Sequence, residues 1–92
     1  MKANHVEGQN KGKVMLYALS TCGWCKKTKA LLKQLNVSYD YIDVDLLDEK
    51  EKDEIMQALR KWNPRGSFPT IVINNDLCIA GYEDAKIIKE LG

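Results

Sequence analysis

The sequence has no long hydrophobic run, no excess of charge of one sign, and few cysteines or histidines. No apolar stretch approaches the roughly 20 residues that a membrane-spanning helix needs. The 14 basic and 13 acidic side chains leave a net charge of +1. Basic and aromatic residues also fail to interleave as single-stranded nucleic acid binding requires. These absences argue against a membrane protein and against a nucleic-acid-binding protein.

The sequence contains three cysteines and one histidine. An odd, small number of cysteines argues against a secreted scaffold held by disulfides. Tetrahedral zinc takes four ligands, and a close cysteine pair could be completed only by the distant Cys78 and His5, so a structural zinc module is disfavoured. We expect His5 to be exposed and without a role. Cys78 is expected to act as a small buried apolar side chain, with a regulatory or intermolecular disulfide as the alternative.

The 92 residues suffice for one small domain. Residues 1–12 are polar, contain two glycines and lack the apolar core of a secretory signal. We predict that they form a flexible arm and that residues 13–92 form the folded domain. Without a signal, a close cysteine pair is more typical of catalysis or metal binding than of a structural disulfide, and the expected compartment is the cytoplasm.

Hydrophobic patterning predicts an α/β domain. Short apolar or alternating segments indicate strands, and apolar residues three and four positions apart indicate helices. Acidic residues at 48–51 and basic residues at 60–61 suit the two ends of the second helix. The predicted order is a strand at 13–19, a helix from Trp24 to about Asn36, a strand at 38–45, a helix at 47–62, strands at 69–73 and 77–80, and a short helix that begins at 83–84.

The order β-α-β-α-β-β-α predicts a four-stranded mixed sheet flanked by three helices. The first two strands should be parallel and joined by a right-handed crossover. The last two should form an antiparallel hairpin, because residues 74–76 are types that tolerate a left-handed turn. We expect the helix at 47–62 and the final helix to lie on the opposite side of the sheet from the first helix.

Cys22 and Cys25 stand where the first strand gives way to the first helix. The first N–H groups of a helix have no intrahelical partner, and the helix dipole adds partial positive charge there. Both effects favour a thiolate, and cysteines in such positions titrate at about 3.5–7.5 instead of roughly 8.5. The spacing therefore predicts a redox-active dithiol. Lys26 and Lys27 either add favourable positive charge or form only a solvated helix face.

Three motifs occur in order along the chain: C-G-W-C at 22–25, S-F-P-T at 67–70 and A-G-Y-E-D at 80–84. Together they resemble the glutaredoxin family of the thioredoxin-like fold over about residues 13–91. The resemblance implies a thiol–disulfide oxidoreductase that acts on disulfide-containing proteins or glutathione mixed disulfides, as a monomer and without a resident cofactor. It also implies that Cys22 attacks the substrate and that Cys25 resolves the mixed disulfide.

The other motif residues are implied to bind substrate. By resemblance, Pro69 is a cis proline beside the cysteines, and the main chain of Phe68 pairs with the substrate backbone. Trp24 forms an aromatic platform. Simpler roles are a packing residue for Trp24 and a strand-opening proline for Pro69. The turn that would bind glutathione comprises Gly81, Tyr82 and Asp84, although Asp84 also suits the start of a helix.

The chain departs from the family pattern where a lysine usually pairs with the glycyl carboxylate of glutathione. That position is Leu19, and Lys26 or Arg65 would have to substitute for the lysine. Ala80 and Phe68 also replace the usual glycine and valine. The electron donor therefore stays open between glutathione and a dedicated reductase.

Gly23, which follows the first cysteine, keeps a second function open. Some glutaredoxins with glycine here hold a 2Fe–2S cluster between two subunits, through the first cysteine of each subunit and glutathione. This resemblance makes an iron–sulfur carrier the alternative to disulfide reduction.

Overall fold

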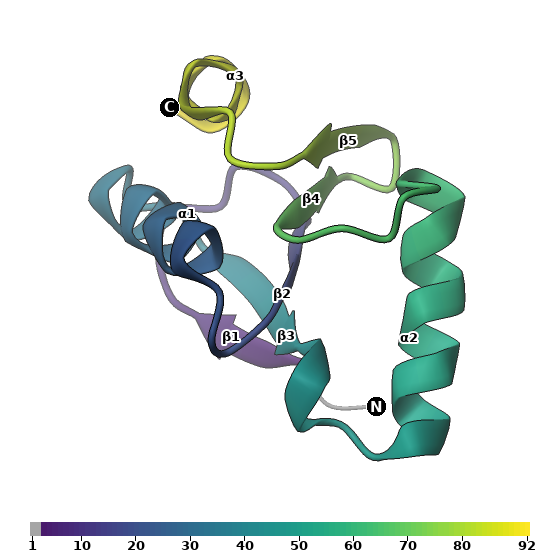
Figure 1. The fold of residues 1–92 in the computed structure, drawn as a ribbon. Helices are drawn as coiled ribbons and strands as arrows, with labels where there is room; N and C mark the ends of the chain where they lie inside the picture. The colour runs from purple at the N-terminus through teal and green to yellow at the C-terminus, as the bar shows by residue number, and fades with distance from the viewer. Residues whose placement is uncertain (1–2) are drawn as a thin grey trace.

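The computed structural model describes residues 3–92, which form one mixed five-stranded sheet with helices on both faces (Figure 1). The strand order across the sheet is β1-β3-β2-β4-β5. The elements are β1 (Asn4–Val6), β2 (Val14–Ala18), α1 (Gly23–Gln34), β3 (Tyr39–Asp43), the 3₁₀ turn η1 (Val44–Leu46), α2 (Glu49–Trp62), β4 (Thr70–Ile73), β5 (Leu77–Ala80) and α3 (Asp84–Leu91).

The prediction of four strands was one strand short, because Asn4–Val6 lies within the segment expected to be a loose arm. This strand pairs antiparallel with β3 and forms one edge of the sheet. His5 is exposed, as predicted, and its Nδ1 lies 2.7 Å from an Asp40 carboxylate oxygen. Its three residues are exposed or half-exposed and show no alternation of apolar and polar side chains, so no sequence pattern indicates this strand. Met1 and Lys2 of the predicted arm lie outside the described residues.

The central strand β2 confirms the predicted topology. It pairs parallel with β3 and antiparallel with β4, so the β2-α1-β3 crossover joins parallel strands. β4 and β5 form the predicted antiparallel hairpin. Asn74 and Asn75 have φ values of 55° and 51° at its turn, the left-handed backbone that asparagine tolerates and that tight hairpins require.

The first helix begins and ends where the local sequence predicts. Cys22 is the N-cap of α1, and Leu31 and Leu32 lie on its buried side. Asn36 follows the helix with a φ of 56°, which turns the chain out of the helix and toward β3. None of the helices in residues 3–92 is long and apolar enough to cross a membrane.

The predicted placement of the helices on the sheet was wrong: α1 and α3 share one face, and α2 covers the other (Figure 1). Alternate residues of β2 point to opposite faces, so Leu16 contacts the α1 and α3 side while Tyr17 contacts the α2 side. The handedness rule fixes only the connection between parallel strands. It does not place α2, which leads into an antiparallel strand, or α3, which ends the chain.

Candidate active site

Cys22 occupies the start of α1, as the sequence predicts. Its Sγ accepts a hydrogen bond from the backbone N–H of Cys25 at 3.2 Å, and its carbonyl oxygen accepts one from the N–H of Lys26. The side chain is partly exposed. The N–H groups of a helix's first turn have no intrahelical partners, and a sulfur that accepts from one of them lies where negative charge is stabilised.

Cys25 lies one turn further into the helix, and its residue surface is 0% exposed. Burial and the hydrogen bond with Cys22 raise the pKa of the Cys25 thiol to about 12. The Leu19 main chain and the Lys29 ammonium oppose this shift. The two sulfurs therefore have different environments, and Cys25 stays a protonated thiol at neutral pH.

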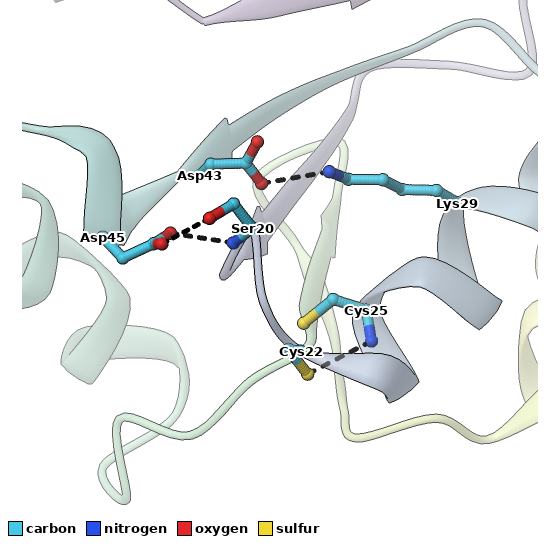
Figure 2. A network of polar contacts seen from close by, with 6 residues as sticks. All are labelled: Ser20, Cys22, Cys25, Lys29, Asp43 and Asp45. Carbon is cyan, nitrogen blue, oxygen red and sulfur yellow. Dashed lines mark hydrogen bonds and ion pairs between the residues drawn. The ribbon is translucent and has the colours of Figure 1, made fainter.

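Two acidic residues near the end of β3 tie down the segments on either side of the cysteines (Figure 2). Asp45 accepts hydrogen bonds from the Ser20 N–H at 2.8 Å and the Ser20 hydroxyl. These bonds lower the pKa of the Asp45 carboxyl. Asp43 pairs with Lys29 at 3.0 Å, one turn beyond Cys25. The loop before Cys22 and the helix after Cys25 are thus both anchored to the same stretch of chain.

A cleft of about 180 Å³ collects the substrate-binding residues that the resemblance implies. The Trp24 side chain is 56% exposed, and its ring lies 5.5 Å from that of Tyr82, centroid to centroid. The Nζ of Lys27 lies 4.6 Å from the Trp24 ring centroid, within range of a cation–π interaction. The residues that line the cleft are Trp24, Phe68, Pro69, Gly81 and Tyr82.

Pro69 and Gly81, which both line the cleft, are joined by a backbone hydrogen bond. The Phe68–Pro69 peptide is cis, as the resemblance implies. The N–H of Gly81 donates a hydrogen bond of 2.7 Å to the carbonyl oxygen of Pro69. Gly81 has a φ of 83°, and no heavy atom lies within 4 Å of where a Cβ would be. Its conformation suits glycine, and the space beside it admits the close approach of a ligand backbone.

Asp84 does not line this cleft. It is exposed at the first residue of α3, and its carboxylate accepts a hydrogen bond from the N–H of Ala85 at 2.8 Å, which matches the simpler role of a helix-start acid. Leu19 packs on the α2 side of the sheet. Lys26 and Arg65, the candidate substitutes for the family's lysine, are both exposed.

Two polar residues that support the site were missed by the sequence analysis. Asn63 is buried, 5% exposed, in the loop before Pro69, and Asp45 binds the loop before Cys22. Asparagine in a loop and aspartate at a strand end are common, so a single sequence offers no signal for either. Only the burial of Asn63 and the contacts of Asp45 reveal them.

Cys78 lies in β5, partly buried, and burial raises the pKa of its thiol. Within residues 3–92, no group of three or more His, Cys, Asp or Glu side chains could hold a metal ion. A metal cluster on Cys22 would therefore need ligands from outside this chain.

Comparison with known proteins matches the glutaredoxin family model to residues 14–78. The glutaredoxin of Methanosarcina mazei Go1 is 48% identical, and its structure superposes with a TM-score of 0.91 over 100% of this chain and 89% of that one. Methanoredoxin of Methanosarcina acetivorans is 42% identical, with a TM-score of 0.92 over 100% and 96% of the two chains.

A sequence relative is the glutaredoxin-like 8.6 kDa protein in the rubredoxin operon of Clostridium pasteurianum. It is 37% identical over 83% of this chain and 93% of its own length. The family match, the shared fold and the paired cysteines at the start of α1 agree, and the chain belongs to the glutaredoxin family.

Proposed function

We propose that this chain reduces disulfides of proteins and mixed disulfides of glutathione through Cys22 and Cys25. Membership of the glutaredoxin family supports a thiol–disulfide oxidoreductase. The observation that carries the proposal is the contrast between the two thiols. Cys22 is partly exposed at a helix start, whereas Cys25 is buried and its pKa is raised to about 12.

The reaction follows from this contrast. The Cys22 thiolate attacks a substrate disulfide, one substrate sulfur leaves as a thiolate and takes up a proton, and a mixed disulfide forms on Cys22. Cys25 then loses its proton and attacks the Cys22 sulfur, which releases the second substrate thiol. Two electrons pass to the substrate, and the chain is left with a Cys22–Cys25 disulfide. An external thiol or a reductase restores the dithiol.

Substitution of each cysteine tests the proposal. We expect Cys22→Ser to abolish disulfide reduction. Cys25→Ser should keep activity on small glutathione mixed disulfides and trap protein substrates as mixed disulfides. Cys78→Ser is the matched control and should reduce substrates at the wild-type rate. Full turnover by Cys22→Ser would overturn the assignment of the attacking thiol.

Glutathione is the proposed co-substrate, bound in the cleft beside Trp24 and Tyr82 with the Asp84 carboxylate at its γ-glutamyl ammonium. Gly81 leaves space for the peptide backbone. The family's lysine is replaced by Leu19, and the exposed Lys26 or Arg65 would pair with the glycyl carboxylate instead. Recycling assays with glutathione and glutathione reductase, or with a thioredoxin-type reductase, distinguish the donors. Turnover only with the second system would reject glutathione as the donor.

The iron–sulfur carrier remains the second candidate because of Gly23. This residue is exposed, and no heavy atom lies within 4 Å of where its Cβ would be. A second subunit could therefore approach Cys22 closely, and its own Cys22 and two glutathione thiols would complete the ligands of a 2Fe–2S cluster. Oxygen-free purification tests this: a brown dimer supports the carrier, and a colourless, active monomer rejects it.

We propose that the reduced protein is a monomer of the cytoplasm. The chain has three cysteines, and a small, odd number of cysteines suits a reducing compartment better than a secreted scaffold held by disulfides. Sedimentation of the reduced protein tests the monomer, and fractionation of cells tests the location.

A further inference from the structure

The loop between α2 and β4 is built around one buried polar side chain, that of Asn63. Its residue surface is 5% exposed, and its backbone N–H donates to the carbonyl oxygen of Leu59 at 2.8 Å, which ends α2. Its carbonyl oxygen accepts from the N–H of Gly66 at 2.9 Å. A buried amide is costly unless its polar atoms are hydrogen-bonded, so the partners of this side chain matter.

The polar atoms of the Asn63 side chain all have partners, in the loop or at the first residue of β4. The Nδ2 group donates to the hydroxyl oxygens of Ser67 and Thr70, each at 3.0 Å. The Oδ1 atom accepts from the N–H of Arg65 at 3.2 Å. One side chain therefore joins the beginning, the middle and the end of the loop.

These bonds bracket the cis peptide. Thr70 is 0% exposed, and its hydroxyl donates to the carbonyl oxygen of Ser67 at 2.9 Å. Ser67 and Thr70 are thus tied both to each other and to Asn63, and only Phe68 and Pro69 lie between them. The Pro69 carbonyl is held from the other side by the N–H of Gly81.

The main chain of Phe68 is left free within this frame. Phe68 belongs to no helix or strand. Among the backbone hydrogen bonds that residues 3–92 form outside those elements, none involves Phe68. Phe68 also lines the cleft with Trp24. A peptide could therefore add to this edge as an extra strand, provided that the loop holds the edge at a fixed position relative to Cys22.

We propose that Asn63 is a positioning residue that holds the Phe68 main chain where an extended substrate pairs with it, which aligns the substrate disulfide with Cys22. The inference rests on the proposed disulfide reduction. Asn63 acts through Ser67 and Thr70 and does not touch the reacting sulfurs. Its effect is therefore specific to substrates that have a peptide backbone to align.

Comparison of two substrates distinguishes a positioning role of Asn63 from a general loss of stability in the Asn63→Ala variant. The first is the mixed disulfide of glutathione with an extended cysteine-containing peptide, and the second is bis(2-hydroxyethyl) disulfide, which has no peptide backbone. Both are reduced by the pre-reduced protein without free glutathione, because glutathione would convert the second substrate into a mixed disulfide that has a backbone. For Asn63→Ala, we expect kcat/KM on the peptide to fall about tenfold or more, because small misplacements of a reacting group cost factors of this order. The rate with bis(2-hydroxyethyl) disulfide should stay within about twofold of wild type, because this substrate has no backbone to align.

Thr70 supplies a second test in case Asn63→Ala folds poorly. Thr70→Val removes the hydroxyl at nearly constant volume and should show the same selective loss, whereas Thr70→Ser keeps the hydroxyl and should restore peptide reduction. Equal losses on both substrates, or no loss on the peptide by folded Thr70→Val, would overturn the positioning role. Failure of the wild-type protein on both substrates would instead reject the proposed function itself.

Discussion

Two cysteines on one helix acquire different chemistry because their surroundings differ. Cys22 caps α1 and is partly exposed, while Cys25 is buried one turn later and its pKa is raised to about 12. A buried thiol is not accessible to a disulfide in solution. It reacts when a mixed disulfide forms beside it, since attack on a neighbouring sulfur is effectively unimolecular. In the proposed reaction, the helix therefore determines which cysteine acts first.

Lys29 is expected to assist the second of these steps. Its positive charge lowers the pKa of Cys25 against the effect of burial. In Lys29→Gln, Cys25 should resolve the mixed disulfide roughly two- to fivefold more slowly. This corresponds to a rise of about 0.4–1 kcal/mol in the activation free energy of that step. Rapid-quench measurement of the conversion to the Cys22–Cys25 disulfide checks this. Lys33→Gln, an exposed lysine one turn further on, is the control, and equal rates in the two variants would contradict the prediction.

The raised pKa of Cys25 also predicts how stability changes in alkali. An unfolded cysteine titrates near pH 8.5, whereas folded Cys25 titrates at about 12. The folded state therefore holds this proton more tightly, and the resulting stability is present below about pH 8.5 and is lost as the pH rises toward 12. Burial raises the pKa of Tyr17 and Tyr39 in the same direction.

Urea unfolding at pH 8 to 11 measures this loss. We expect the free energy of unfolding to fall with pH in the wild-type protein and to fall less steeply in Cys25→Ser. The two tyrosines remain in both proteins and serve as an internal reference. Identical pH dependence in the two proteins would show that Cys25 is not the titrating group.

Secondary structure places the proposed site residues at the ends of helices and strands. Cys22 is at the start of α1, Pro69 immediately before β4, and Gly81 immediately after β5. β4 pairs with both β2 and β5, and Thr70 lies between Tyr17 and Ala80. The three ends therefore lie next to one another, where these strands begin or end. The anchor between Asp45 and Ser20 then fixes the loop that leads into α1 (Figure 2).

The Asp45 anchor is expected to weaken in acid. Hydrogen bonds from Ser20 lower the pKa of Asp45, so the stability they provide is present above the unfolded value of roughly 3.9 and is lost as the pH falls through the lower folded pKa. The loss of unfolding free energy between pH 6 and pH 2 should therefore be smaller in Asp45→Ala than in the wild-type protein. Asp53→Ala, an exposed residue of α2, is the control and should lose as much stability as the wild type. An equal loss in Asp45→Ala would contradict the anchor.

Most element positions could be predicted because periodicity and turn residues report them locally. The strand at 77–80 matches β5, and Asn36 ends α1 with a left-handed backbone. β1 could not be predicted, since a three-residue edge strand carries too little pattern. The three motifs named the residues that line the cleft as candidates for substrate binding, and Asp84, which does not line it, as another. No motif pointed to Asn63, because burial of a loop amide depends on the packing of α2 against β4.

The domain as a whole has two apolar layers separated by the sheet. One contains Ile87 of α3, and the other contains Ile55 of α2. The sequence did not show which helices share a layer, since β2 is apolar on both faces. The consequence is that α3, which follows the Gly81 turn, packs in the same layer as Cys25, so packing on this face supports the cleft.

Two core substitutions test that consequence. Ile55→Ala and Ile87→Ala should each lower the free energy of unfolding by about 2–5 kcal/mol, measured by urea unfolding. Only Ile87→Ala should also raise KM for a glutathione mixed disulfide, because α3 supports the turn at Gly81 and Tyr82. A similar rise in KM for Ile55→Ala would show that the two layers do not act separately.

Differential alkylation tests the division of labour between the two cysteines most directly. Reduced Cys78→Ser protein is treated at pH 7 with less than one equivalent of iodoacetamide, and the modified residue is identified by peptide mass mapping. We predict that Cys22 alone is modified in the folded protein and that Cys25 reacts only after unfolding. Modification of Cys25 as fast as Cys22 in the folded protein would contradict the account.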